Sequence, residues 1–244
     1  MRLVLFDIDG TVVNAGGAGR VALTRALDAT YGAVGSIDGY DFRGKTDPRI
    51  VLDLLGGTGL GEDAIHAGLE ACFAAYLQEL DAEVGDGARV RLLPGVAEVV
   101  RALSKREDTL VGLLTGNIEA GAEVKLRSTG LWPFFRVGAF GSDHADRRRL
   151  PAIARQRVRE RLGHEIPFDR VTIVGDTPLD VDCARACGAL AVAVATGRHS
   201  VDELSACEPD LLFRDLGDVE RVLGALCGDG DAGADPRSGR GPAA

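Results

Sequence analysis

The sequence predicts an α/β protein: a Rossmann-like parallel sheet core with helices on both faces, and an α-helical cap domain inserted after the first strand. Three short apolar runs, at residues 3–6, 110–114 and 171–174, predict buried strands, and each run ends in small, hydroxyl or acidic residues. Segments with helical spacing alternate with the later runs, which is typical of a parallel sheet. Residues 15–92 show helical patterns and no convincing strand.

The first strand ends on two carboxylates. Asp7 and Asp9 are separated by one residue and followed by Gly10 and Thr11. In open α/β sheets, ligands bind at the carboxyl ends of the strands. Two carboxylates this close repel one another unless a cation or a shared proton lies between them, so the pattern indicates a metal site. The alternative is a strand-to-turn junction in which Asp9 and Gly10 only shape the turn.

Helical spacing and start signals predict the elements of the cap. Expected helices cover residues 20–31, 47–55 and 62–80, and residues 12–19 and 86–94 would be its two hinges. The rest of the chain alternates between the two kinds of element. We expect helices at 96–103, 118–129, 150–162, 179–187 and 218–226, and strands at 109–114, 135–140, 171–174, 189–195 and 211–213.

These elements predict three regions. Residues 1–14 and 93–227 would form the α/β catalytic core, residues 15–92 the helical cap, and residues 228–244 a disordered tail, because the tail is rich in Gly, Pro, Asp and Ala without periodicity.

Composition excludes several classes of protein. A net charge of -9 and an isoelectric point near 5.0 argue against general binding to nucleic acid or to anionic membranes. No apolar run is long enough for a membrane span. The five cysteines show neither Cys-x-x-Cys pairs nor zinc-ligand spacing, which suits a reduced cytoplasmic protein.

Three ordered motifs carry a resemblance to a known family. They are Asp-Ile-Asp-Gly-Thr at residues 7–11, Thr-Gly-Asn at residues 115–117, and Gly-Asp-Thr-Pro-Leu-Asp at residues 175–180. In order and spacing they resemble the haloacid dehalogenase superfamily of aspartate-nucleophile hydrolases, and the phosphoglycolate-phosphatase-like members that carry a helical cap between the first and second motifs.

The resemblance implies roles for the acidic residues. Asp7 would be the nucleophile that forms an aspartyl phosphate, and Asp9 the general acid and base. Asp176 would bind Mg²⁺ together with Asp7 and the backbone carbonyl of Asp9, in the all-oxygen site that this ion prefers. Asp180 would orient the metal's waters or another side chain, with direct ligation as the less favoured role. The alternative for Asp176 and Asp180 is a structural role at the start of the next helix.

The second motif would bind the phosphoryl group. The Thr115 hydroxyl and the backbone amides of Gly116 and Asn117 would act as neutral donors to its oxygens.

The third family motif departs from its usual form. Members of the family commonly have a lysine before the helix that here begins near Leu150, whereas this chain has three consecutive arginines and no lysine after Lys125. A guanidinium can also screen the nucleophile and the phosphate. Alignment on Pro151 selects Arg148, and the strand-to-helix junction selects Arg147, which we favour.

One loop of the cap carries two cations. Residues 42–47 read Phe-Arg-Gly-Lys-Thr-Asp, and Arg43 and Lys45 could reach an anionic substrate, as in a similar cap loop of phosphoglycolate-phosphatase-like members. A solvated turn that caps the next helix explains the same residues equally well.

Together these observations predict a Mg²⁺-dependent phosphatase that acts on a small phosphorylated metabolite, as a monomer or homodimer. A sugar phosphomutase of the same superfamily would share the catalytic residues, and a catalytically silent regulatory or binding protein would share the fold. Dehalogenase activity is disfavoured because Asp9 has no task in halide release. Phosphonate hydrolysis would need Lys45, the one lysine of the cap.

Overall fold

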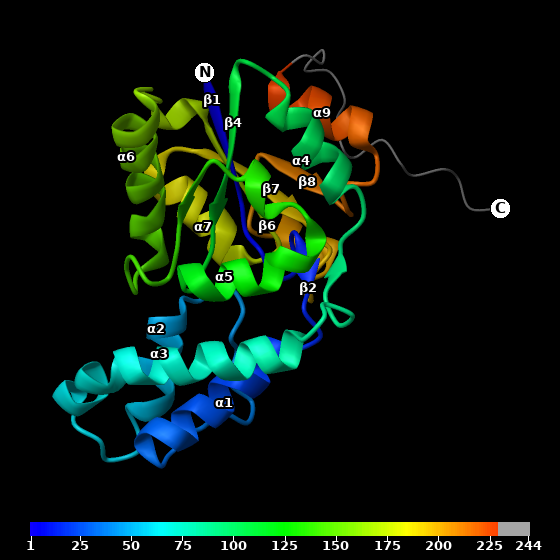
Figure 1. The fold of residues 1–244 in the computed structure, drawn as a ribbon. Helices are drawn as coiled ribbons and strands as arrows, with labels where there is room; N and C mark the ends of the chain where they lie inside the picture. Colours follow the sequence, from blue (N-terminus) through cyan, green and yellow to red (C-terminus); the bar gives the residue numbers. More distant parts are fainter. Residues whose placement is uncertain (229–244) are drawn as a thin grey trace.

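The computed structural model describes residues 1–228 and contains a six-stranded parallel sheet (Figure 1). The strand order is β5-β4-β1-β6-β7-β8, so β1 lies inside the sheet. The strands are β1 (Arg2–Phe6), β4 (Thr109–Leu114), β5 (Val137–Ala139), β6 (Val171–Gly175), β7 (Leu190–Val194) and β8 (Leu211–Phe213).

The register of β1 brings three strand ends to one edge of the sheet. Phe6 is level with Leu113 of β4 on one side and with Val174 of β6 on the other. All of these pairings are parallel, so the residues that come directly after β1, β4 and β6 emerge next to one another. The three predicted motifs are those residues.

Helices cover both faces of the sheet. Val4 and Phe6 point into one apolar cluster with α4 and α9, whereas Leu3 and Leu5 point into another with α6 and α7. This alternation results from the two-residue period of a strand, and it explains why the first apolar run has no polar member. The helices of this part are α4 (Val96–Ser104), α5 (Glu119–Leu126), α6 (Leu150–Leu162), α7 (Pro178–Cys187), α8 (Val201–Ser205) and α9 (Val219–Cys227).

A second group of helices has a core of its own. The helices α1 (Ala18–Tyr31), α2 (Asp47–Leu55) and α3 (Glu62–Val84), called the cap helices from here on, lie together (Figure 1). They pack around a separate apolar cluster. They are joined to the sheet through β2 (Val13–Asn14) and β3 (Arg91–Leu92), which pair antiparallel. The division of the chain into a core domain, residues 1–14 and 93–227, and a cap domain, residues 15–92, stays a prediction.

The α/β fold class is confirmed, with differences in detail. The β2–β3 pair and α8 were not expected, because elements of two and five residues are too short for a period to show. The third core strand is shorter than the expected residues 135–140. The described residues also contain four short 3₁₀ turns: η1 (Arg127–Thr129), η2 (Trp132–Phe134), η3 (Arg147–Arg149) and η4 (Phe168–Arg170). The predicted disordered tail lies, except for Gly228, outside the described residues.

Within residues 1–228, no helix combines the length and the apolar character that crossing a bilayer requires.

We predict that Gly95→Ala destabilises the protein much more than Gly130→Ala. Both glycines have positive φ, 75° and 68°, where an alanine costs about 1–2 kcal/mol. A methyl group on Gly95 would also overlap the backbone carbonyl of Leu216, whereas nothing lies within 4 Å of one on Gly130. Urea unfolding should therefore show a loss of about 3 kcal/mol or more for Gly95→Ala. Equal losses would contradict the close packing of α4 on residues 216–217.

Candidate active site

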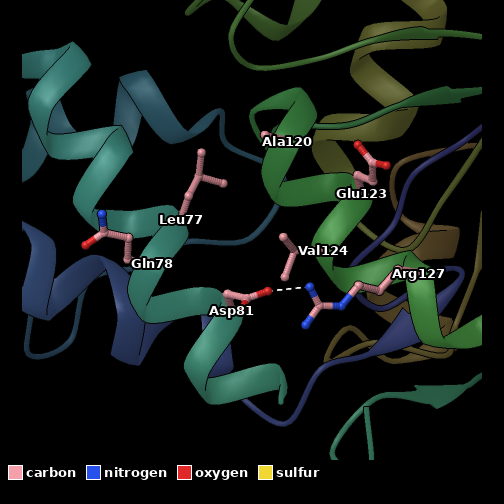
Figure 2. A pocket seen from close by; sticks show the side chains of 7 residues that line it. All are labelled: Leu77, Gln78, Asp81, Ala120, Glu123, Val124 and Arg127. Atoms are coloured by element: carbon pink, nitrogen blue, oxygen red, sulfur yellow. Dashed lines mark hydrogen bonds and ion pairs between the residues drawn. The ribbon is translucent and has the colours of Figure 1, made fainter. Parts of the chain in front are cut away.

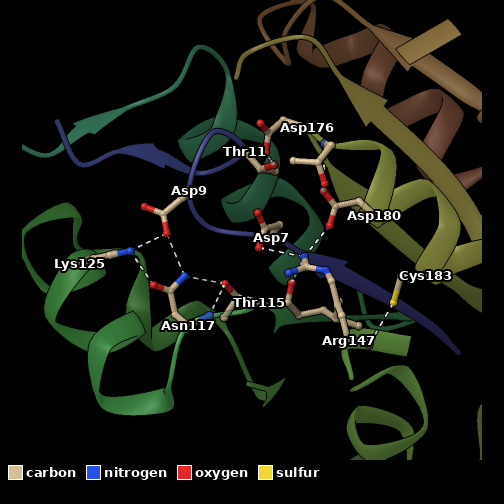
Figure 3. A network of polar contacts seen from close by, with 12 residues as sticks. Asp7, Asp9, Thr11, Thr115, Asn117, Lys125, Arg147, Asp176, Asp180 and Cys183 are labelled. Carbon is tan, nitrogen blue, oxygen red and sulfur yellow. Dashed lines mark hydrogen bonds and ion pairs between the residues drawn. The ribbon is translucent and has the colours of Figure 1, made fainter. Parts of the chain in front are cut away.

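Three buried carboxylates meet at the carboxyl edge of the sheet. Asp7 comes directly after β1 and is 5% exposed, and its backbone N–H donates to Val174 O at 2.9 Å. Asp176 and Asp180 come from the end of β6 and the start of α7. One oxygen of each of the three carboxylates lies within 4.8 Å of the others (Figure 3). Carboxylates at this spacing form a set of hard oxygen ligands.

Electrostatics favours a cation among these carboxylates. Burial raises the pKa of Asp7 to about 6, although Arg147 opposes the shift, and the nearby carboxylates add to it. Burial, and then the charge of Asp7, raise the pKa of Asp176 to about 8. A divalent cation would stabilise both groups in their ionised forms. The chemistry of the donors therefore fits Mg²⁺, which Asp7 and Asp176 would hold.

The backbone leaves room only for small residues around Asp176. Gly10, which has a φ of 88°, and Gly197 both lie so close that a methyl group on either would overlap the Asp176 carboxylate. The Thr11 hydroxyl donates to Asp176 Oδ1 at 3.2 Å. Gly10 thus lets the chain turn tightly beside the motif at residues 175–180.

Arg147 supplies positive charge next to Asp7. Its side chain is 7% exposed and forms ion pairs with Asp7 Oδ1 at 3.1 Å and with Asp180 Oδ1 at 2.5 Å. It also donates to Leu114 O at 3.2 Å. Arg147 Nε is buried and has no hydrogen-bond partner among residues 1–228, so one donor stays available beside Asp7.

Arg148 points elsewhere, which corrects the expectation that it could act at the site. Its side chain is 61% exposed and pairs with Asp182 at 2.7 Å. Residues 147–149 form the 3₁₀ turn η3, so successive side chains point about 120° apart and only Arg147 faces the carboxylates.

Asp180 binds protein groups with both of its oxygens. Oδ2 accepts from the N–H of Thr177 at 3.0 Å and from its hydroxyl at 2.7 Å, while Oδ1 accepts from Arg147. These bonds complete a capping box at the start of α7. Asp180 therefore orients Arg147 and fixes the start of the helix that follows Asp176.

The Thr-Gly-Asn motif lies opposite this cluster. Thr115 is fully buried, and its hydroxyl oxygen accepts from the Asn117 N–H at 3.3 Å and from Asn117 Nδ2 at 2.8 Å. Gly116 is closely covered by the backbone carbonyl of Lys45, so the cap loop rests directly on this motif.

Asp9 has a partner that sequence reasoning missed. Lys125, on α5, is buried, and its Nζ donates to Asp9 Oδ2 at 2.6 Å and to Asn117 Oδ1 at 2.5 Å (Figure 3). Asp9 is not part of the carboxylate cluster, so its side chain is separate from the metal ligands. The signal in the sequence was a lysine that shares the apolar face of a helix with Ile118 and Ala122.

Residues 42–47, called the cap loop, are joined to the segments after β4 and β5 by three hydrogen bonds. The Asp47 N–H donates to Gly116 O at 2.7 Å, the Ile118 N–H donates to Asp47 Oδ2 at 2.8 Å, and the Thr46 hydroxyl donates to Ala145 O at 2.6 Å. Thr46 is also the N-cap of α2. The loop is therefore packed over the site and is not a solvated turn.

The two cations of this loop are already paired. Arg43 binds both carboxylate oxygens of Asp41, at 2.7 and 2.9 Å. Lys45 lies 3.5 Å from Asp53 and 4.0 Å from the centre of the Tyr40 ring. Neither cation has an ion pair or hydrogen bond to Asp7 or Asp176 within the described chain, so a role in substrate binding would require one of them to exchange partners.

A depression of about 610 Å³ lies between α3 and α5 (Figure 2). The ion pair between Asp81 and Arg127 crosses it. None of its lining residues belongs to the three motifs: they are Leu77, Gln78, Asp81, Ala120, Glu123, Val124 and Arg127. It lies where α3, one of the cap helices, packs against α5.

The chain is similar in sequence and fold to known proteins. A family model described as haloacid dehalogenase-like hydrolase matches residues 4–185. The phosphoglycolate phosphatase of Synechococcus elongatus is 30% identical over 229 residues, covering 93% of this chain and 99% of that protein. Among solved structures, a hydrolase from Pseudomonas syringae is 21% identical with a TM-score of 0.66, covering 92% of this chain and 98% of the other. A Bacteroides vulgatus protein provisionally assigned as a β-phosphoglucomutase is 18% identical with a TM-score of 0.67, covering 93% and 89%.

We predict that Arg147→Met lowers the free energy of unfolding by about 3–5 kcal/mol at pH 7, because it leaves buried carboxylates without their counter-charge. Arg148→Met, one residue away and exposed, should change it little. Urea unfolding of both variants without divalent cations provides the measurement. Similar losses in the two variants would show that Arg147 does not compensate the cluster.

A second prediction concerns Asp47. Burial raises its pKa from 3.8 to about 6, against the opposing charge of Lys125. Between these values the folded protein binds more protons than the unfolded chain, so the contribution of Asp47 to stability falls as pH rises from 4 to 6. Relative to Asp47→Asn, the wild-type free energy of unfolding should drop by about 3 kcal/mol over this interval. Parallel pH profiles for the two proteins would contradict the shift.

Proposed function

The chain belongs to the haloacid dehalogenase-like hydrolases and is a phosphatase, and from this premise we propose that it hydrolyses a small phosphomonoester with Mg²⁺ through an aspartyl-phosphate intermediate. The observation that supports this most strongly is the convergence of Asp7, Asp176 and Asp180 with Arg147 at the end of the central strand.

In the first half-reaction, Asp7 would act as the nucleophile. One of its carboxylate oxygens attacks phosphorus, and the bond between phosphorus and the ester oxygen breaks. Asp9 gives its proton to that oxygen, which leaves as an alcohol. Asp9 is suited to this task because its side chain is 45% exposed and separate from the buried metal ligands.

In the second half-reaction, Asp9 would act as a base. Its carboxylate takes a proton from water, the water oxygen attacks phosphorus, and the bond to Asp7 breaks to release inorganic phosphate. Asp7 and Asp9 thereby return to their starting states.

Charge compensation would come from two sources, a bound cation and Arg147. Bound Mg²⁺ supplies Lewis-acid stabilisation of the phosphoryl oxygens and cancels their repulsion with Asp7. Asp7 and Asp176 would hold it, with the backbone carbonyl of Asp9 as a further ligand. Arg147 provides a fixed positive charge next to Asp7, and its buried Nε is a donor without a partner in the described chain. Thr115 and the amides of Gly116 and Asn117 would donate to the remaining phosphoryl oxygens.

The substrate would be a small metabolite, because the cap loop is packed over the site. Several relatives are phosphoglycolate phosphatases, so 2-phosphoglycolate is the first compound to test. Arg43 or Lys45 could bind its carboxylate after exchanging partners with Asp41 or Asp53. We also propose a cytoplasmic enzyme, since no disulfide joins the five cysteines.

A sugar phosphomutase is the second candidate, favoured by the fold shared with the Bacteroides vulgatus protein. It would use the same Asp7 and Asp9 and differ in retaining the phosphoryl group. A regulatory protein without turnover is disfavoured, because every acidic position of the motifs is present and buried or hydrogen-bonded at one edge.

We predict Mg²⁺-dependent release of phosphate from 2-phosphoglycolate or another small phosphomonoester, reduced at least about 10³-fold by Asp7→Asn, because an amide cannot form the intermediate. A colorimetric phosphate assay with and without EDTA measures it. Arg148→Met serves as a control that retains activity. If no ester is hydrolysed but phosphoryl groups move between positions of a sugar phosphate, the mutase assignment replaces this one.

A further inference from the structure

We propose that Lys125 is a positioning residue for the reaction: together with Asn117, it fixes the Asp9 carboxylate for proton transfer while the cap helices cover the site. This inference rests on the proposed function, in which Asp9 exchanges a proton with the leaving oxygen and with water. None of the three sequence motifs includes Lys125, which lies eight residues after the second.

Two donors converge on one oxygen of Asp9. Lys125 Nζ lies 2.6 Å and Asn117 Nδ2 2.9 Å from Asp9 Oδ2. Lys125 also donates to Asn117 Oδ1 at 2.5 Å, so the three side chains form a closed ring of hydrogen bonds. Because both donors occupy Oδ2, Oδ1 is the oxygen that is left to exchange a proton with substrate. A carboxylate held at one oxygen has few orientations left for the other.

The same ring connects proton transfer to phosphoryl binding. Asn117 Nδ2 also donates to Thr115 Oγ1 at 2.8 Å (Figure 3). Thr115 is the residue expected to bind a phosphoryl oxygen, so the distance between that oxygen and the proton donor is set by one rigid set of contacts.

The cap helices close the space around the ammonium group. A methyl group on Gly19, in the first turn of α1, would lie 3.2 Å from Lys125 Nζ and 3.6 Å from the hydroxyl oxygen of Tyr76 on α3. The Lys125 side chain is consequently only 5% exposed. A buried ammonium strengthens its hydrogen bonds because water does not compete for them. The packing of α1 and α3 over α5 therefore shields from water the hydrogen bond by which Lys125 holds Asp9.

Leaving-group dependence provides the test. An alkyl phosphate releases an alkoxide, which needs a proton, whereas an aryl phosphate with an electron-withdrawing substituent releases a stable phenolate. The ratio kcat/KM reports the steps up to departure of the leaving group. For Lys125→Met, which keeps the length and removes the charge, we expect kcat/KM for 2-phosphoglycolate to fall about 10- to 100-fold more than for 4-nitrophenyl phosphate.

Lys105→Met, at an exposed site after α4, is the matched control and should leave both values unchanged. A smaller perturbation is Gly19→Ala. Its methyl group would displace the Lys125 ammonium group slightly, while alanine has a higher helix propensity than glycine in α1. This variant should lower kcat/KM for 2-phosphoglycolate several-fold with an unchanged or higher Tm, a combination that a purely structural contact would not give.

The possible outcomes are distinct. A wild-type protein that hydrolyses neither these two esters nor any other small phosphomonoester would overturn the proposed function and this role with it. A wild-type protein that is active, with Lys125→Met losing equally on both esters or not at all, would overturn the role of Lys125 alone. If Lys125→Met does not fold, Gly19→Ala decides: loss confined to the alkyl ester supports the inference, and unchanged kinetics overturn it.

Discussion

Repulsion among buried carboxylates is the constraint on which the site depends. Asp7, Asp176 and Asp180 lie within one small space, and Arg147 provides the one cation that pairs with any of them in the described part of the chain. One guanidinium cannot neutralise three carboxylates, which is why burial and mutual charge raise the pKa of Asp7 and Asp176. A divalent cation bound here would reduce this deficit of positive charge and stabilise the cluster.

The polar groups divide into two sets with different tasks. The buried set around Arg147 is suited to hold a cation and a nucleophile. The second set, formed by Asp9, Asn117 and Lys125, is separate from it and lies beside the cap helices, where a proton donor can be fixed without joining the metal ligands. The cap loop is hydrogen-bonded to Gly116 and Ile118, the two chain neighbours of Asn117. The position of the cap loop and the position of Asn117 in the second set are therefore connected through adjacent backbone.

The fold and the acidic cluster could be predicted because their signals are local. Buried strands appear as apolar runs, and the loops after neighbouring parallel strands emerge at the same edge of the sheet. The sequence favoured Arg147 over Arg148 but kept both as candidates, because the distinction depends on side-chain directions in a 3₁₀ turn. Lys125 was missed because its partner Asp9 lies 116 residues earlier in the chain. The packing of the cap loop depended on long-range backbone contacts that leave no periodic pattern.

Anomalous diffraction from crystals grown with Mn²⁺, a stand-in for Mg²⁺, tests the central claim most directly. We expect one strong peak within bonding distance of the carboxylates of Asp7 and Asp176, lost in crystals of Asp176→Asn. A peak that lies elsewhere, or no peak while Arg147 still pairs with Asp7, would show that the guanidinium alone satisfies the cluster and would contradict the account.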